Sequence, residues 1–263
     1  MQNILEQIVA TKHQEVNRLR QATPVEQLKD NTFFSRKTLS LQERLSRHGS
    51  SGIIAEFKKQ SPSKGSINPS AIVEEITRGY AEAGAAGISV LTDFSYFGGS
   101  VIDLVKAREA NPETPILRKD FMIDPYQIIE ARAYGADVIL LIAACLSKDQ
   151  VHELAAAARE HDLEVLLEVH NEEELEKISP LVNLVGVNNR NLKSFVVDTN
   201  TSIALAGLIP DEFVKISESG ISHPETIGQL RQHGFEGFLI GENFMKTNDP
   251  AQSCRNFIDA LKQ

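Results

Sequence analysis

The chain has few cysteines, and none of its apolar runs is long. Cys145 and Cys254 are its two cysteines, and they form no CxxC pair. This usage indicates a reducing setting and argues against a structural zinc site. No apolar run is long enough to span a membrane. The N-terminal residues lack the basic start and apolar segment of a secretory signal, so we expect a cytoplasmic protein.

The chain also has fewer basic than acidic residues, 27 against 36. The formal net charge is −9 over 263 residues, which argues against nucleic-acid binding. It does not exclude an anionic small-molecule partner, because a few lysines in a cleft can focus a local positive field. The seven histidines show neither HxH nor HExxH spacing, so we expect no metal site.

What the chain does have is a regular succession of short apolar runs with amphipathic segments between them. The runs cover residues 52–57, 87–91, 115–117, 137–142, 164–169, 184–187, 213–217 and 237–240. Strands that alternate with helices indicate parallel βαβ units. Eight units in this length favour an α/β fold of the closed (β/α)₈ TIM-barrel type. A doubly wound sheet is the alternative, but the loop after the first run, residues 60–65, is not GxGxxG.

About fifty residues precede the first run. Apolar positions from Ile4 to Leu19 lie close to helical spacing, and further helices are expected over residues 24–28 and 40–48. Pro24 suits the first position of a helix. The region is too short for a core of its own. We therefore expect one barrel domain over residues 1–263, of which residues 1–50 are an N-terminal helical extension.

Polar residues follow most of the apolar runs, where a barrel of this type places its active site. The first run ends in Glu56 and Lys58, which share one face because residues two apart on a strand point to the same side. An acid and a base at the end of a buried strand are costly to desolvate, which favours a functional site over a structural ion pair. The same period-two count predicts one inward-facing set: Lys58, Lys119, Glu168, Asn188 and Ser219. Lysines and a glutamate in one mouth suit general acid–base chemistry.

The loops after the last two runs contain Ser219-Gly220 and Gly241-Glu242. Barrels often bind phosphate in these loops through backbone N–H groups and a short helix. Glycine allows the backbone to approach an anion closely. We therefore expect a phosphate pocket there, to which the hydroxyl of Ser61 in the first loop could add a donor.

Five blocks of sequence carry a resemblance to a known family. They are residues 54–65 (IAEFKKQSPSKG), 117–121 (LRKDF), 167–170 (LEVH), 186–192 (GVNNRNL) and 217–221 (SESGI). In this order the chain resembles indole-3-glycerol phosphate synthase, a barrel enzyme of tryptophan biosynthesis. The resemblance implies a lyase that acts on 1-(2-carboxyphenylamino)-1-deoxyribulose 5-phosphate. That reaction closes a pyrrole ring with loss of carbon dioxide and water, and it needs neither a metal nor an organic cofactor. The resemblance implies a small-molecule phosphate as partner. We expect a monomer or weak homodimer.

The resemblance also implies roles for particular residues. Lys119 would be the general acid on the ribulose carbonyl, and Lys58 would hold the substrate carboxylate and share in proton donation. Glu168 would be the general base for dehydration, and Glu56 would position Lys58 or assist a later proton transfer. The remaining implied residues are Asn188 and Arg190 as orienting groups, Glu218 and Ser219 lining the site, and Ser61, Gly220, Gly241 and Glu242 in the phosphate pocket.

The proton transfers that the reaction requires agree with these roles. Ring closure on a ketone needs one donated proton, and dehydration needs one proton donated and one removed. Phe97, Phe121 and Leu140 are placed to form an apolar wall for the aryl ring. Glu242 departs from the family pattern, which has serine in several members. A carboxylate there would repel phosphate, so we expect it to point away and to contribute only its backbone N–H.

Some residues are assigned no role, and other functions stay open. We expect His170 to begin a solvated loop that leads to the solvated acidic helix start at Glu172, and Cys145 to be a buried structural thiol. A Schiff-base aldolase using Lys58 or Lys119, a sugar-phosphate isomerase, or a catalytically silent barrel acting as a binding module remain alternatives.

Overall fold

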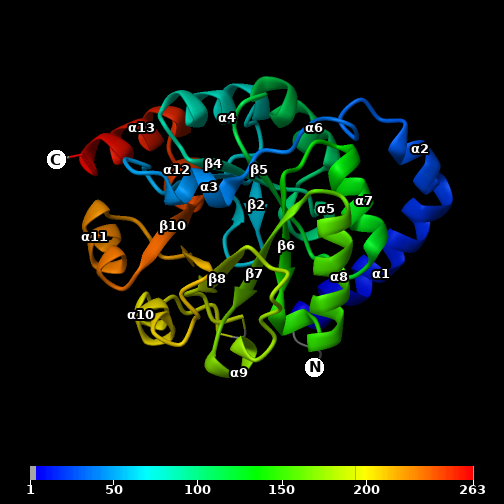
Figure 1. The fold of residues 1–263 in the computed structure, drawn as a ribbon. Helices are drawn as coiled ribbons and strands as arrows, with labels where there is room; N and C mark the ends of the chain where they lie inside the picture. Colours follow the sequence, from blue (N-terminus) through cyan, green and yellow to red (C-terminus); the bar gives the residue numbers. More distant parts are fainter. Residues whose placement is uncertain (1–3, 193, 263) are drawn as a thin grey trace.

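The computed structural model describes residues 4–192 and 194–262 as a closed barrel of parallel strands wrapped by helices (Figure 1). The strand order around the barrel is β1-β10-β9-β8-β7-β6-β5-β4. This confirms the predicted (β/α)₈ barrel, and each predicted apolar run forms one strand. The strands are β1 (Ile53–Phe57), β4 (Gly87–Leu91), β5 (Ile116–Lys119), β6 (Val138–Ile142), β7 (Glu164–Val169), β8 (Leu184–Asn188), β9 (Val214–Glu218) and β10 (Phe235–Ile240).

The strands are mainly apolar because both faces of the sheet are covered. In β6 every residue is buried. Val138, Leu140 and Ile142 belong to the core inside the barrel, whereas Ile139 and Leu141 belong to the core between the sheet and the helices. The period of two therefore sorts one continuous apolar run into two separate cores.

Helices connect the strands and cover the outside of the barrel (Figure 1). Several begin at side-chain caps. Ser147 forms a capping box with Gln150, and Asp124 and Asp249 cap helices whose first residue is proline. The helices between and after the barrel strands are α4 (Val73–Glu82), α5 (Phe94–Phe97), α6 (Val101–Ala110), α7 (Pro125–Ala133), the 3₁₀ turn η1 (Ala143–Cys145), α8 (Lys148–Glu160), α9 (Glu172–Leu175), α10 (Asn200–Ala206), α11 (Pro224–Gln232), α12 (Glu242–Met245) and α13 (Pro250–Ala260).

The N-terminal extension folds into the three predicted helices, α1 (Ile4–Ala22), α2 (Val25–Lys29) and α3 (Leu41–Ser46). Leu41 and Leu45 of α3 join the core inside the barrel. The carboxylate of Glu164, at the start of β7, accepts hydrogen bonds from the backbone N–H groups at the N-terminus of α3, among them that of Leu41 at 2.9 Å. Helix α3 thus closes the end of the barrel where the strands begin.

Asp137, directly before β6, fastens the extension to the same end of the barrel. Its side chain is fully buried and pairs with Arg36 at 2.7 Å and with Arg108. It also accepts backbone N–H donors from Leu39 and Ile116 at 2.8 Å. A buried carboxylate with this many partners is a structural anchor.

The loop after β1 contains a small antiparallel hairpin of β2 (Gln60–Ser61) and β3 (Gly65–Ser66). The sequence predicted a loop over residues 60–65, without this hairpin. Gly65 adopts φ +66°, a conformation that glycine reaches without steric cost. The hairpin stands over the strand ends and brings its side chains toward the site.

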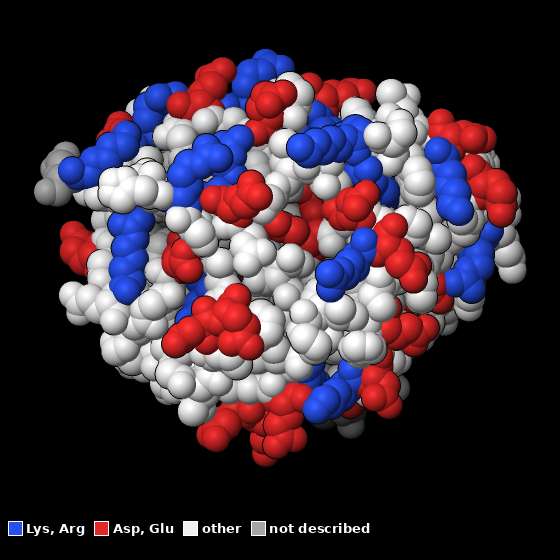
Figure 2. Space-filling model, in the orientation of Figure 1, with Lys and Arg blue, Asp and Glu red and all other residues white. Residues whose placement is uncertain are grey.

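Over the face shown in Figure 2, lysine and arginine side chains are interspersed with aspartate and glutamate. Among the residues that the structure describes, no helix is both long and apolar enough to cross a bilayer.

Candidate active site

Every site residue predicted from the sequence lines a single cavity of about 560 Å³. The cavity lies at the carboxyl ends of the strands, opposite the end closed by α3. The predicted residues that it brings together are Glu56, Lys58, Ser61, Phe97, Lys119, Phe121, Leu140, Glu168, Asn188, Arg190, Glu218, Ser219, Gly220, Gly241 and Glu242.

The pair that β1 delivers to the cavity is in direct contact. Lys58 Nζ lies 2.6 Å from Glu56 Oε1, and the Glu56 side chain is 3% exposed. Gly241 faces this carboxylate, because a Cβ at that position would lie 2.3 Å from Glu56 Oε1. Glycine at 241 therefore makes room for Glu56, which holds Lys58 at the rim of the cavity.

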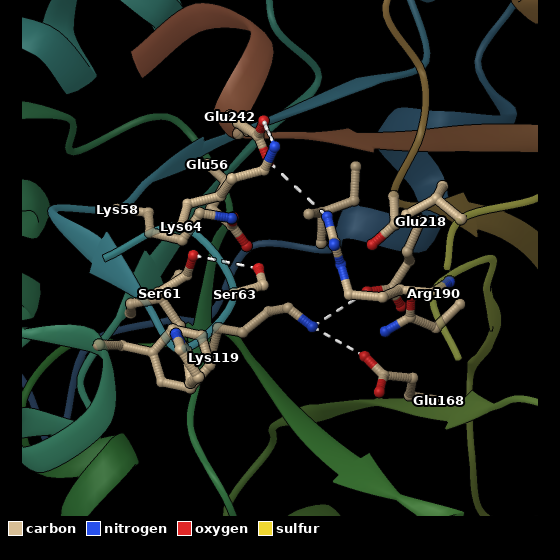
Figure 3. A pocket seen from close by; sticks show the side chains of 18 of the residues that line it. Glu56, Lys58, Ser61, Ser63, Lys64, Lys119, Glu168, Arg190, Glu218 and Glu242 are labelled. Atoms are coloured by element: carbon tan, nitrogen blue, oxygen red, sulfur yellow. Dashed lines mark hydrogen bonds and ion pairs between the residues drawn. The ribbon is translucent and has the colours of Figure 1, made fainter. Parts of the chain in front are cut away.

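The centre of the cavity is a lysine between two buried carboxylates (Figure 3). Lys119, from the end of β5, places Nζ 2.9 Å from Glu168 Oε2 of β7 and 3.0 Å from Glu218 Oε2 of β9. Both carboxylate side chains are nearly inaccessible. A Cβ on Gly186 would lie 2.3 Å from Glu218 Oε1, so this glycine makes space for the third member of the cluster.

The two carboxylates differ in proton affinity. Burial alone would raise the pKa of Glu168, but Lys119 and His170 together outweigh it and hold that pKa well below its usual value. Burial raises the pKa of Glu218 to about 7, against the pull of Lys119 and with the repulsion of Glu168. Burial alone would lower the pKa of Lys119, but the two carboxylates raise it above its usual value. The cluster thus holds an ammonium, an ionised carboxylate and a carboxyl that titrates near neutrality, which suits proton transfer in both directions.

His170 is not in a solvated loop, so that expectation was wrong. Its side chain is 10% exposed, with Nε2 3.4 Å from Glu168 Oε1 and Nδ1 3.2 Å from Glu174 Oε2. The expectation of a solvated helix start also fails for Glu174, whose side chain is 12% exposed. Helix α9 turns this one acid inward, where it meets the imidazole.

The loop after β9 has an uncommon backbone at the predicted phosphate end. Ser219 adopts φ +66° and Gly220 φ +78°. Asn189 supports the loop by donating Nδ2 hydrogen bonds to Ser217 Oγ at 3.0 Å and to the Ser219 carbonyl at 3.1 Å. Residues in the left-handed backbone conformation can direct successive N–H groups into a concave loop that is suited to an anion. Gly241 is the N-cap of α12, so further N–H groups point from that helix start.

The carboxylate of Glu242 does not point away, contrary to expectation. It lies 3.5 Å from Lys64 Nζ and 3.7 Å from Arg190 Nη2, and both cations line the same cavity (Figure 3). Ser61 lies beside them, with its hydroxyl 3.4 Å from that of Ser63. Glu242 thus pairs with the two cations that an incoming anion would otherwise meet.

The apolar wall is formed by more than the predicted residues. The rings of Phe97 and Phe121 pack with centroids 6.1 Å apart, and Leu140 is buried beneath the mouth. Helix α1 adds side chains that the sequence did not assign to the site, namely Ile4, Leu5 and Ile8.

A buried lysine holds α1 against the barrel. Lys12 Nζ lies 2.8 Å from Glu15, 2.9 Å from Asp93 and 2.9 Å from Asp120, the residue after Lys119. Its side chain is 5% exposed. A lysine on the apolar stripe of a predicted helix was the available sequence signal for this contact, because such a position needs buried anionic partners.

The described residues contain no group of three or more histidine, cysteine or acidic side chains arranged to hold a metal ion. Cys145 is partly rather than fully buried. Burial raises the pKa of its thiol to about 12, with a further contribution from Glu168. The thiol is therefore neutral near pH 7 and a poor nucleophile.

A closed (β/α)₈ barrel with paired lysines and carboxylates at the carboxyl ends of its strands defines a class of protein: a barrel enzyme that works by proton transfer. Comparison with known proteins identifies the family within this class. A family model described as indole-3-glycerol phosphate synthase matches residues 5–257. The chain belongs to the indole-3-glycerol phosphate synthase family, the carboxy-lyases of tryptophan biosynthesis.

Curated relatives agree with the family match. The chain is 47% identical to an indole-3-glycerol phosphate synthase of Bacteroides thetaiotaomicron over 262 residues, covering 100% of both chains. It is 45% identical to one of Salinibacter ruber, over 95% of this chain and 93% of that one. It is 49% identical to one of Acinetobacter baumannii, over 79% of this chain and 78% of that one.

Two solved structures share the fold alone. One is a chain of the tryptophan synthase α2β2 complex of Pyrococcus furiosus, with a TM-score of 0.57 and 15% identity over 81% of this chain and 98% of that one. The other is 3-hexulose-6-phosphate synthase of Salmonella typhimurium, with a TM-score of 0.60 and 14% identity over 80% and 98%.

Proposed function

We propose that this chain converts 1-(2-carboxyphenylamino)-1-deoxyribulose 5-phosphate to indole-3-glycerol phosphate by general acid–base catalysis. Family membership supports the reaction, and the cluster of Lys119 between Glu168 and Glu218 supports the mechanism. That cluster is the observation on which the proposal chiefly depends, because it places an acid and a base within 3.0 Å of each other in a buried site.

The first chemical step is attack of the aryl ring carbon on the ribulose ketone. Lys119 donates a proton to the oxygen that becomes negative, and is left as a neutral amine. Lys58, held by Glu56 at 2.6 Å, binds the substrate carboxylate until it leaves as carbon dioxide. Loss of that group restores the aromatic ring.

Dehydration then completes the pyrrole ring. The hydroxyl formed in the first step leaves as water after receiving a proton from Lys58, and Glu168 removes a proton from the new ring. Two protons are donated and one is removed, so the site takes up one proton for each turnover. This balance follows because an anionic carboxylate leaves as neutral carbon dioxide.

The substrate would lie with its two ends at opposite sides of the mouth. Its phosphate would meet the loops of Gly220 and Gly241, with Ser61 as a further donor, and its aryl ring would pack against Phe97 and Phe121. Asn188 and Arg190 would orient the ribulose chain, and Ser219 and Glu218 would line the middle of the cavity. The distribution of polar and apolar lining supports this orientation.

The test is a steady-state assay that follows indole fluorescence without added metal. We expect turnover by the wild type and a loss of ~10²–10⁴-fold in kcat for both Lys119→Ala and Glu168→Gln, since each removes one proton transfer. Lys262→Ala, an exposed lysine paired only with Asp259, is the matched control and should keep wild-type turnover. Near-normal turnover by Lys119→Ala would show that the general acid is another group.

An aldolase that uses Lys119 as its Schiff-base nucleophile is disfavoured by the state of this lysine. Such a nucleophile must be a neutral amine, whereas the two carboxylates raise the pKa of Lys119 and keep it an ammonium. Borohydride treatment in the presence of substrate should leave no covalent adduct. An adduct at Lys58 or at Lys119 would favour the aldolase.

The remaining properties are part of the same proposal. We propose a single domain over residues 1–263 with residues 1–50 as its extension, a monomer or weak homodimer in the cytoplasm, and no nucleic-acid or membrane partner. We propose that turnover needs no cofactor. Sedimentation of the purified protein and dialysis against a chelator before assay would test these points.

A further inference from the structure

Beyond the residues assigned above, one ionisable side chain touches the proposed general base. His170 leaves the end of β7 two residues after Glu168, and its Nε2 lies 3.4 Å from Glu168 Oε1. The contact is an ion pair at this distance and does not have hydrogen-bond alignment. Glu168 therefore has a cation at each oxygen, since Lys119 Nζ lies 2.9 Å from Oε2.

The imidazole is braced on its other side by a second carboxylate. Glu174 Oε2 lies 3.2 Å from His170 Nδ1 and accepts the His170 backbone N–H at 2.8 Å. Asn171 caps α9 and contacts the other oxygen of Glu174 at 3.3 Å. The short helix thus fixes Glu174, and Glu174 fixes the ring.

Both neighbours favour the charged form of the ring. Burial alone would lower the pKa of His170, but Glu168 and Glu174 outweigh it and raise the pKa to about 10. The other ionisable groups nearby do not reverse this. Cys145 on η1 is neutral near pH 7, and Lys177 directs its ammonium to the carbonyls of η1 and Leu146 at 2.7 and 2.9 Å.

We propose that His170 is a positioning residue for the general base: an imidazolium braced by Glu174 that keeps Glu168 ionised while Lys119 is without its proton. This inference rests on the proposed function, in which Lys119 becomes a neutral amine after the first step. At that moment Glu168 loses one of its two cations and remains buried beside Glu218.

Without His170, a buried carboxylate with no cation would take up a proton from its surroundings. Glu168 would then be unable to remove the proton that dehydration requires. His170 faces the oxygen that Lys119 does not use, so its charge persists through the whole cycle. The second cation therefore serves the step after the first proton transfer rather than the resting state.

A titration that needs no turnover tests the contact directly. The Lys119→Met variant imitates the neutral amine, and carboxyl ¹³C NMR of glutamate-labelled protein follows Glu168, which is assigned by its loss in Glu168→Gln. We expect the pKa of Glu168 to be at least about one unit higher in Lys119→Met/His170→Gln than in Lys119→Met. Lys119→Met/His152→Gln is the control, because His152 lies on α8, contacts Ser179 and does not line the cavity. Equal Glu168 pKa values in all three proteins would overturn the proposal.

The pH dependence of turnover supplies the second test. In His170→Gln the acid limb of the kcat profile should move to higher pH, because Glu168 protonates more readily, while KM stays within about twofold. Glu174→Gln should move the limb in the same direction by less, and it tests the brace even where His170→Gln folds poorly. An unmoved limb with kcat lowered equally at every pH would reduce His170 to a structural role. Absence of wild-type turnover would contradict the proposed function alone, since the NMR titration stands without it.

Discussion

Replacement of Lys12 by methionine should release α1 from the barrel without unfolding the barrel itself. The carboxylates of Glu15, Asp93 and Asp120 all lie within 2.9 Å of Lys12 Nζ, and Asp120 has a second cation in Arg118 at 3.1 Å. Methionine keeps the length and apolar stem of the side chain but removes the charge. Asp93 and Asp120 are 1% and 3% exposed, so both carboxylates would lose a buried partner.

The size of the effect follows from these burials. Removing one partner of a buried ion pair costs about 3–5 kcal/mol. The apolar contribution to docking comes mainly from Ile8 and Val16, which are 3% and 2% exposed and are worth about 1.5–3 kcal/mol each. The cost of leaving the two carboxylates without Lys12 is therefore comparable to the apolar stabilisation of the docked helix. We expect α1 to undock locally, because undocking lets water reach both carboxylates.

Hydrogen exchange measured by mass spectrometry would detect this undocking. A loss of about 3 kcal/mol corresponds to roughly 100-fold faster exchange of the α1 amides, with the barrel strands unchanged. KM should rise because Ile4 and Ile8 line the cavity. Lys262→Met is the control: it removes an exposed lysine–aspartate pair and should leave the stability unchanged, because such pairs are screened by solvent. Unchanged protection of α1 in Lys12→Met would refute the reasoning.

Further predictions concern the two ends of the barrel. Asp137→Asn leaves the buried Arg108 and the partly buried Arg36 poorly paired and should lower the free energy of unfolding by about 3–5 kcal/mol in urea, with kcat retained by the folded fraction; a loss under about 1 kcal/mol would contradict the anchor. The pKa of Asp120 is about 2, because Lys12 and Arg118 outweigh its burial, whereas its unfolded value is near ~4. Its ionised form therefore adds stability above that unfolded value, which is lost as the pH falls toward 2. Acid unfolding of Asp120→Asn should show a shallower dependence on pH in this window, and an identical slope would be the contrary result. Gly186→Ala, whose Cβ would lie 2.3 Å from Glu218, should lower kcat more than tenfold while costing about 1–3 kcal/mol of stability; kcat within twofold of wild type would show that the carboxylate moves freely.

Much of the barrel could be predicted from the sequence because its signals are local. Each apolar run forms a strand buried on both faces, so the runs themselves reveal number and order. The position of each polar residue at a strand end then predicts which side chains share the mouth. Glu56, Lys58, Lys119, Glu168 and Asn188 were found in this way, and the cavity contains all of them.

The remainder depends on contacts that no local pattern records. His170 lies on the same side as Glu168 by the period of two, but only the fold shows that Glu174 reaches back to cover it. The apolar positions of Leu41 and Leu45 predict a helix and not what it covers. The carboxylate of Glu242 was expected to point away because it would repel a phosphate. Its cationic partners, Lys64 and Arg190, come from distant loops that the local sequence does not reveal.

The closure of the barrel by α3 and Asp137 separates two tasks along the barrel axis. Strands of four to six residues at about 3.3 Å each place these anchors roughly 13–20 Å from the catalytic end. Residues that hold the fold together are thus different from those that contact a ligand. A library that randomises the loops at the mouth would leave the anchors untouched, so selection for a new substrate can proceed at one end while the other end preserves the scaffold.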